Sequence, residues 1–453
     1  MTVKPEWSAG LAGIVGEERL LLGEEQREKL SKDYYWYSPV LEPLLRGKRA
    51  DGIVQPEAER EVAEVLAYAY RHDIPVTTRG AGTGNYGQAV PLDGGLVLDL
   101  SRLDAVLEAT DAFVRVQAGV RLGALEKRLR EQGKELRIYP STFMKATVGG
   151  FVCGGSGGIG SITYGNLWDG NVLEAVVWTM EESPRRLVVK GAELQAYIHN
   201  YGTNGVLTEL TLPIAERTEW SQAVAQFDEF EAACRFCYAL SLTDSIRKRL
   251  VAPVEWPIPS FFKPLVKKLE SGAAACLLEV EEGNEAALAA LAEAEGGRIG
   301  YAVPADRYRQ GIGLSDFTWN HTTLWALNAD PTLTYLQAGF DPIRFMEQIS
   351  ELKSRFGDEL LLHLEFVRSG GTVMPSALPI VRYTTEERLY EIIAFCESIG
   401  VGINDPHTYK LESGGRGRLE AMLAAKRAND PKGLLNPGKL QLPVAGSARG
   451  DGR

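Results

Sequence analysis

Basic charge, long apolar runs and paired cysteines are all scarce in this sequence of 453 residues. It has 49 Lys and Arg against 60 Asp and Glu, a formal net charge of -11. Such an acidic chain disfavours nucleic acid or an anionic membrane as the main partner. No run approaches the roughly 18 apolar residues that span a bilayer, and the N-terminus lacks the apolar core of a signal peptide. We therefore expect a soluble cytoplasmic protein, with no transmembrane segment, that acts on a small molecule.

The five cysteines form an odd set without the paired spacings of a disulfide framework or a zinc site. We therefore expect reduced thiols and predict no metal site. Cys234 and Cys237 do match the CxxC pattern. The apolar spacing around them predicts a helix with both thiols on its buried side, and core packing is favoured over redox chemistry because no second pair accompanies them.

The length exceeds what one hydrophobic core usually serves, so two domains are expected. Gly133 is expected to end a helix, because a residue with positive φ is common at that position. The apolar periodicity of the first domain predicts helices over 57–72, 122–132 and 192–199, and strands over 74–78, 96–100, 113–117, 171–179, 186–189 and 206–212.

The first domain is expected to end near Pro213, followed by the polar residues 216–219. Beyond this boundary the pattern strand, helix, strand occurs twice, which suggests a ferredoxin-like α+β sheet. The final residues, 443–453, are rich in Gly, Ala and Ser and are predicted to be a disordered tail. The two strand-helix-strand units beyond the boundary cover 273–281, 285–295 and 298–303, then 334–340, 342–355 and 359–367.

Residues 79–84, Arg-Gly-Ala-Gly-Thr-Gly, directly follow a predicted strand. Glycines let peptide N–H groups approach phosphate oxygens, while Arg79 and Thr83 add a charge and a hydroxyl, so the loop suits a pyrophosphate. Residues 82–87 also spell the GxGxxG of a Rossmann nicotinamide site. That alternative is disfavoured, because the pattern must open a helix and here it leads to another strand.

A second glycine-rich block, residues 146–160, is too dense in glycine for a stable helix or strand interior. We expect its backbone to pack against something flat, such as a cofactor. A flexible linker is the alternative, but the apolar residues Val148, Phe151, Val152 and Ile159 argue against a solvated tether.

Four spaced motifs recur in one order: IPVTTRGAGTG with GQAVP, YPST at 139–142, ATVGG with GGIGS at 146–161, and YGTNGVLTELTL at 201–212. A closing segment reads DPKGLLNPGKL at 430–440. On these motifs the chain resembles the flavoenzymes of the vanillyl-alcohol oxidase and p-cresol methylhydroxylase (PCMH-type) family, nearest its glycolate oxidase and D-lactate dehydrogenase branch.

The resemblance implies an α+β fold: a two-part PCMH-type FAD-binding domain at 1–213, a ferredoxin-like substrate (cap) domain at 214–425, and a segment at 426–442 that returns to the FAD domain. The implied FAD contacts are Arg79, Gly80, Ala81, Gly82, Thr83, Gly84, Asn85 and Gln88, then Pro140, Ser141, Thr142, Thr147, Gly149, Gly150, Cys153, Gly154, Gly155, Gly158, Ile159, Ser161 and Ile162, and finally Gly205, Val206 and Asn436.

Some members of the family bond the flavin covalently through a histidine in the first loop or a cysteine before the glycine pair. Here Thr83 and Phe143 occupy those places, so the resemblance implies non-covalent FAD. Attachment from a histidine or tyrosine of the cap domain stays open.

A histidine is the expected base for removing the hydroxyl proton of a substrate. His72 and His199 each end a predicted helix and are interpreted as surface or helix-terminal residues. The catalytic candidates are His321, in a polar and aromatic cluster; His363, which shares a strand face with Glu365; and His407. The last falls where the glycolate oxidase branch has a Glu-His-Gly motif, but its neighbours Pro406 and Thr408 depart from that motif, so an inherited metal is doubtful.

A carboxylate substrate would need a fork of hydrogen-bond donors. Arg368 and Arg382 are candidates only because of their positions in the chain, and both are more readily interpreted as surface residues. Our leading hypothesis is an FAD-dependent oxidoreductase that oxidises a 2-hydroxy acid or related alcohol by hydride transfer to flavin. The electron acceptor stays open: it is oxygen, quinone or a partner redox protein. The assembly also stays open, and a homo-oligomer and a subunit of a complex are both considered. The alternatives are a flavoenzyme of the same fold with non-redox transfer or epimerase chemistry, and a non-catalytic subunit of a complex.

Overall fold

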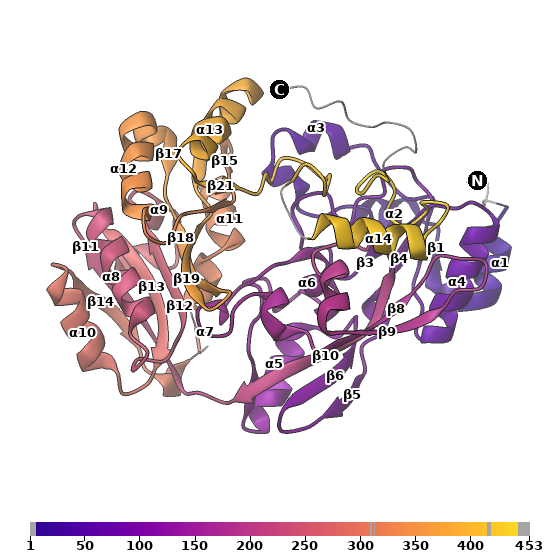
Figure 1. Cartoon of the computed structure of the whole chain (residues 1–453), viewed down its shortest axis with the longest axis horizontal. Coiled ribbons are helices and arrows are strands. Elements are labelled where there is room, and N and C mark those ends of the chain that lie inside the picture. Colours follow the sequence, from indigo (N-terminus) through magenta and orange to yellow (C-terminus); the bar gives the residue numbers. More distant parts are fainter. Residues whose placement is uncertain (1–5, 309, 312, 415–417, 443–453) are drawn as a thin grey trace.

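The computed structural model describes residues 6–308, 310–311, 313–414 and 418–442. In Figure 1 the chain forms two parts side by side, and its last segment crosses back to the first. We call residues 6–216 the first part, 220–414 the second part and 418–442 the returning segment. The predicted disorder of 443–453 lies outside the described residues.

Two sheets build the first part. One is mixed, in the order β1 (Leu20–Leu21), β2 (Gly52–Val54), β4 (Leu96–Asp99) and β3 (Val76–Arg79). The other is antiparallel, in the order β5 (Val106–Ala109), β6 (Phe113–Gln117), β10 (Val206–Glu216), β8 (Glu174–Trp178) and β9 (Arg186–Lys190), with β7 (Lys134–Leu136) on the far end of β10.

In its described residues, the second part contains three sheets. The largest has the order β12 (Lys248–Val254), β13 (Ala274–Glu281), β11 (Trp220–Phe227) and β14 (Arg298–Val303), with antiparallel neighbours throughout. The others are β15 (Leu333–Tyr335), β20 (Ile380–Arg382), β17 (Leu360–Leu361), and β18 (Leu364–Ser369), β19 (Thr372–Ala377), β16 (Ala338–Gly339), β21 (Gly402–Ile403).

The helices cover these sheets or connect their strands. Within the described residues, none combines the length and the apolar character needed to cross a membrane. Their bounds are α1 Ser8–Val15, α2 Glu24–Leu30, α3 Leu41–Leu45, α4 Glu59–Arg71, α5 Leu122–Glu131, α6 Val148–Gly154, α7 Ser161–Tyr164, α8 Phe230–Leu242, α9 Ile258–Phe261, α10 Glu285–Ala294, α11 Asn320–Ala329, α12 Phe345–Phe356, α13 Glu386–Ser398 and α14 Leu419–Asn429.

Helices with a clear apolar stripe form where the periodicity predicts them. In α4 the buried residues are Val62, Val65, Leu66 and Ala69, one face of the helix. Helix α8 buries both Cys234 and Cys237, which confirms their interpretation as core residues. Gly133, just beyond α5, has φ +75°, as expected for a residue that ends a helix.

The glycine-rich block corrects a prediction, because its residues Val148–Gly154 form helix α6. Thr147 caps the helix by accepting a hydrogen bond from the N–H of Gly150 at 3.2 Å. Phe151 and Val152 are buried on one side. Interior glycines cost roughly 1 kcal/mol each in a helix, and the cap together with apolar burial offsets that cost.

Three other predicted elements differ from the structure. The helix expected over 192–199 is a 3-10 helix, η5 (Gly191–Ala196), which ends before His199. The strands expected over 334–340 and 359–367 each break in two. After each break the chain joins a different sheet: β15 and β17 pair with β20, whereas β16 and β18 pair with β19.

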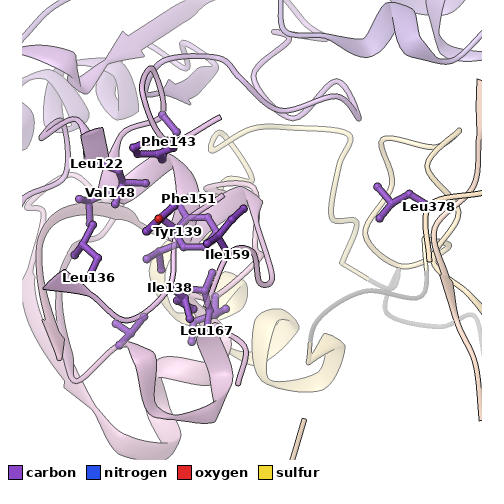
Figure 2. Close-up of a cluster of buried hydrophobic side chains, with 14 of the residues drawn as sticks. Leu122, Leu136, Ile138, Tyr139, Phe143, Val148, Phe151, Ile159, Leu167 and Leu378 are labelled. Carbon is purple, nitrogen blue, oxygen red and sulfur yellow. The ribbon is translucent and has the colours of Figure 1, made fainter. Parts of the chain in front are cut away.

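An apolar cluster underlies the glycine-rich helix α6. Figure 2 shows Val148 and Phe151 packed with Leu122, Tyr139, Phe143 and Ile159, and all are at least nine-tenths buried. The same cluster continues into the second part, where Leu378 follows β19. This packing holds α6 against the sheet of β6 and β10 and leaves its other side toward the space between the two parts.

Candidate functional site

A cavity lies between the two parts and encloses about 1580 Å³ of empty space, some of it open to solvent. The loop after β3, residues 140–142, helix α6 and residues 199–207 line it from the first part. Trp319 and Asn320 line it from the second part, with strands β16 and β19. Its two walls therefore come from separate parts of the chain.

The loop after β3 offers unpartnered donors to this cavity. Within the described residues, the N–H groups of Ala81, Gly82, Thr83 and Gly84 donate no hydrogen bond to the protein. Beside them the buried guanidinium of Arg79 donates to the carbonyl of Lys32 at 2.6 Å. Peptide N–H groups and a cation are the donor set that binds phosphate oxygens, so the residues present fit a pyrophosphate.

The glycines of this loop are required by close packing. Gly82 has φ +65°, and a Cβ built there would overlap the guanidinium of Arg79. A Cβ on Gly80 would overlap Oγ1 of Thr147, the residue that caps α6. The loop and the glycine-rich helix therefore approach each other more closely than residues with side chains would allow.

Most of the predicted cofactor residues line the cavity. Those that do are Arg79, Gly80, Ala81, Gly82, Thr83, Gly84, Asn85, Gln88, Pro140, Ser141, Thr142, Thr147, Gly149, Gly150, Cys153, Gly154, Gly155 and Gly205. Those that the structure places behind its wall are Gly158, Ile159, Ser161, Ile162, Val206 and Asn436.

The residues behind the wall support it. Ile159 pairs with Tyr139 in an isolated bridge, and Ser161 accepts a hydrogen bond from the N–H of Gly158 at 2.9 Å. A Cβ on Gly158 would overlap the carbonyl of Tyr139. These contacts fix the segment that precedes Pro140, which does line the cavity.

The returning segment holds the far end of the glycine loop. Asn436 donates to the carbonyls of Gln88 at 2.9 Å and Tyr201 at 2.5 Å. Lys439, fully buried, donates to the carbonyls of Gln88 and Val90 and to Oδ1 of Asn436. Burial lowers the pKa of Lys439 to about 7, and the nearby carboxylate of Asp33 opposes that shift.

None of the three predicted catalytic histidines lies on the cavity wall. The ring of His407 is engaged on both sides, by the Ser38 hydroxyl at 2.7 Å and the Tyr335 carbonyl at 2.9 Å. His363 is fully buried, with Nε2 at 2.9 Å from Glu365 Oε1. His321 directly follows two wall residues, and burial lowers its pKa to about 4.

The structure corrects the interpretation of His199 as a surface or helix-terminal residue. It is 5% exposed and lies on the cavity wall with φ +56°. Its Nδ1 is 2.8 Å from the carbonyl of Gly155, which only accepts, so Nδ1 carries the proton in the neutral ring and Nε2 carries a lone pair. The sequence hid this residue because the helix expected to contain it ends at Ala196.

The second part contributes only uncharged side chains to the cavity wall in the described residues. Their polar members are Trp319, Asn320, Gln337, Ser376 and Asn404. The first two belong to the polar and aromatic cluster that directed attention to His321, whereas the other three stand near strand ends and carried no sequence signal.

The two arginines considered for a substrate carboxylate lie elsewhere. Arg382 donates to the carbonyl of Asp358, and Arg368 to the carbonyl of Gly371. Neither lines the cavity. Among the described residues, no three His, Cys, Asp or Glu side chains come together in a group that could hold a metal ion.

Comparison with known proteins shows which proteins this chain is similar to. Residues 50–186 match the family model of an FAD binding domain. An FAD-linked oxidoreductase of Mycobacterium tuberculosis is 32% identical over 53% of this chain, and the chain spans about half (53%) of that relative's length. The glycolate oxidase subunit GlcD of Escherichia coli is 26% identical over 85% of this chain and 83% of its own. A structure of alkyldihydroxyacetonephosphate synthase shares the fold with TM-score 0.74 at 16% identity, over 96% of this chain and 85% of that one.

The chain thus contains an FAD binding domain and is homologous to FAD-linked oxidoreductases, among them the glycolate oxidase subunit GlcD. The resemblance based on the sequence motifs is confirmed, and FAD is the cofactor of this domain. The overall α+β architecture is also confirmed.

Proposed function

We propose that the protein is an FAD-dependent oxidoreductase that oxidises a small hydroxylated substrate, a 2-hydroxy acid or related alcohol, to the carbonyl compound. The observation that carries the proposal is the cavity with two walls, one a glycine loop with free N–H groups and the other a row of uncharged polar side chains from a separate part of the chain. The names of its relatives, among them a glycolate oxidase subunit, support a CH–OH substrate.

In this proposal residues 1–213 bind FAD, 214–425 form a cap over the substrate and 426–442 return to the FAD domain. The order β11, α8, β12, β13, α10, β14 with the sheet order β12-β13-β11-β14 supports a ferredoxin-like cap. FAD supplies the hydride acceptor, N5 of the flavin ring. Thr83 lines the cavity and Phe143 is buried beneath it, in the places where other members have bonded residues, which supports non-covalent FAD.

We assign the base to His199 in place of the three histidines expected from the sequence. Oxidation removes a hydride from carbon and a proton from the hydroxyl, and the carbonyl double bond forms between them. Nε2 of His199 takes that proton, because the Gly155 carbonyl accepts from Nδ1–H and so orients the ring at the wall. The electrons then pass to an acceptor: oxygen, quinone or a partner redox protein. The enzyme acts as a homo-oligomer or as a subunit of a complex.

The first test is the visible spectrum of the purified protein before and after acid precipitation. We expect flavin absorbance that is released into the supernatant. Colour that stays in the pellet would contradict non-covalent binding, and a protein that stays colourless with added FAD would contradict the proposal. Bleaching of the flavin by hydroxylated substrates then separates oxidation from the non-redox alternatives, which predict none.

Two variants test the residue roles. Gly82→Val should abolish FAD binding, because the new side chain would displace Arg79 and the positive φ of this residue disfavours valine. Gly47→Val is the control, since a side chain at Gly47 meets open space.

His199→Asn keeps a donor for the Gly155 carbonyl and tolerates positive φ. It should retain stoichiometric FAD yet slow flavin reduction by about 100-fold or more, the usual worth of a general base. An unchanged reduction rate would remove His199 from that role, and the exposed His72→Asn is the matched control.

A further inference from the structure

The end of the glycine loop is tied to the second part by the side chains of two consecutive residues. Asn85, which is 3% exposed, donates from Nδ2 to the hydroxyl of Tyr335 at 2.6 Å. The hydroxyl of Tyr86 accepts a hydrogen bond from Nε2 of Gln337. Asn85 directly follows residues 81–84, whose N–H groups donate to no described part of the protein. The stretch offered to a pyrophosphate therefore ends at an attachment to a distant part of the chain.

Tyr335, in strand β15, is held firmly on its own side of this contact. It is fully buried, and its ring meets that of Tyr37 edge-on with the centroids 6.1 Å apart. Its carbonyl lies 2.9 Å from Nε2 of His407, and Nδ1 of the same ring lies 2.7 Å from the hydroxyl of Ser38. Because close packing leaves a buried ring little room to move, the hydroxyl is presented to the loop at a fixed place.

The side chain of Asn85 depends on that hydroxyl. Among the described residues, the bond to Tyr335 is the only hydrogen bond that this side chain makes. A buried donor that loses its partner keeps the full cost of leaving water, so the side chain would shift to find another acceptor. The backbone would shift with it, and the preceding residue is Gly84, whose carbonyl accepts from the N–H of Tyr34 at 2.7 Å.

Tyr335 does not belong to the cavity wall, whereas Asn85 and residues 81–84 do. It also lies outside residues 50–186, the range that matches the FAD binding domain. An effect of its hydroxyl on the cofactor would therefore pass through the loop and not through direct contact.

We propose that Tyr335 is a positioning residue for FAD: its hydroxyl holds Asn85, and through Asn85 it holds the glycine loop in the conformation that binds the pyrophosphate. The second part thereby contributes to the retention of the cofactor as well as to the opposite wall of the cavity, which Gln337 lines two residues further on. The inference goes beyond the proposed function, because it applies whatever the substrate is.

The test compares Tyr335→Phe, which keeps the ring and removes the hydroxyl, with Thr334→Val as the matched control. Thr334 is also buried in β15, and its hydroxyl joins the two parts by donating to the Tyr37 carbonyl at 2.9 Å. FAD affinity is measured from the FAD released when the holoenzyme is diluted and ultrafiltered. We expect about 10-fold weaker binding in Tyr335→Phe and a change of less than about 2-fold in Thr334→Val. Unchanged affinity in Tyr335→Phe, or an equal loss in both, would overturn the inference.

A double variant separates positioning from a general loss of packing. In an Asn85→Ala background the Tyr335 hydroxyl has no amide to hold, so adding Tyr335→Phe should change FAD affinity by less than about 2-fold. A further loss of about 10-fold there would show that Tyr335 acts by another route. Hydrogen exchange of the peptide covering residues 80–88, at saturating FAD, does not require the double variant. It should be faster in Tyr335→Phe than in Thr334→Val, and equal rates would contradict the proposed role.

Discussion

His321, which directly follows two residues of the cavity wall, shows how burial controls the charge of a single histidine. Burial lowers its pKa from 6.5 to about 4, and the charge of Lys145 acts in the same direction. The folded protein therefore holds this ring neutral, with Nδ1 unpartnered among the described residues. Because the folded-state pKa lies below the unfolded value, the associated stability is complete above pH 6.5 and is lost as the pH falls toward 4.

The substitution His321→Gln should remove this pH dependence. Between pH 7 and pH 4 the unchanged protein should lose up to about 3 kcal/mol more of its free energy of unfolding than the variant. Urea unfolding followed by circular dichroism at several pH values measures the difference. His72→Gln is the control because His72 is exposed. Parallel pH profiles for the protein and His321→Gln would contradict the prediction.

How far the site could be predicted differs from residue to residue. The loop Arg79–Gly84 lines the cavity as expected, because glycine spacing after a strand constrains the backbone locally. His407 and His363 are both catalytic candidates in the sequence, yet their rings are engaged inside the protein. Which histidine faces a cavity depends on contacts between residues far apart in sequence, and periodicity carries no information on those contacts.

At the scale of elements, most helices and strands of the first part form where their apolar patterns predict them. The exceptions have local physical causes. Helix α6 forms in spite of its glycines because Thr147 caps it and the core beneath receives Phe151. The two long strands expected in the second part break because their halves belong to different sheets, and no single-strand pattern expresses that division.

The returning segment provides a prediction at this scale. Lys439→Met removes three buried hydrogen bonds and leaves the carbonyl of Val90 without its partner, while the carbonyl of Gln88 keeps only Asn436. We expect a loss of about 2–4 kcal/mol in the free energy of unfolding, measured on FAD-depleted protein, and weaker FAD binding. Lys432→Met is the control, since Lys432 bonds Asp73 at the surface. Equal stability of the two variants would show that the buried hydrogen bonds of Lys439 are dispensable for stability.

At the scale of the whole molecule, a buried charge network joins the two parts. Arg249 of β12 lies 2.7 Å from Glu279 and 3.7 Å from Glu135, which belongs to β7 of the first part. Arg130 pairs with Glu135 at 2.6 Å, and the Arg249 guanidinium stacks over Trp220. The two parts are therefore joined, at β12 and β7, through charges that are removed from water.

Arg249→Met should destabilise the protein by about 3–5 kcal/mol, because it leaves two buried carboxylates without their common partner. The double variant Arg249→Met with Glu279→Leu should recover part of that loss, since a buried pair replaced by apolar groups costs little. Chemical unfolding followed by tryptophan fluorescence measures both. A double variant less stable than Arg249→Met alone would contradict this account of the network.

The clamp formed by Asn436 and Lys439 also bears on the order of events during synthesis. The glycine loop leaves the ribosome more than 300 residues before the side chains that fasten its far end at Gln88 and Val90. A nascent chain that ends in the second part therefore has the loop without its fastening. Stable cofactor loading is accordingly a late event, and a ribosome-stalled chain that stops before Asn436 should bind FAD less tightly than the released protein.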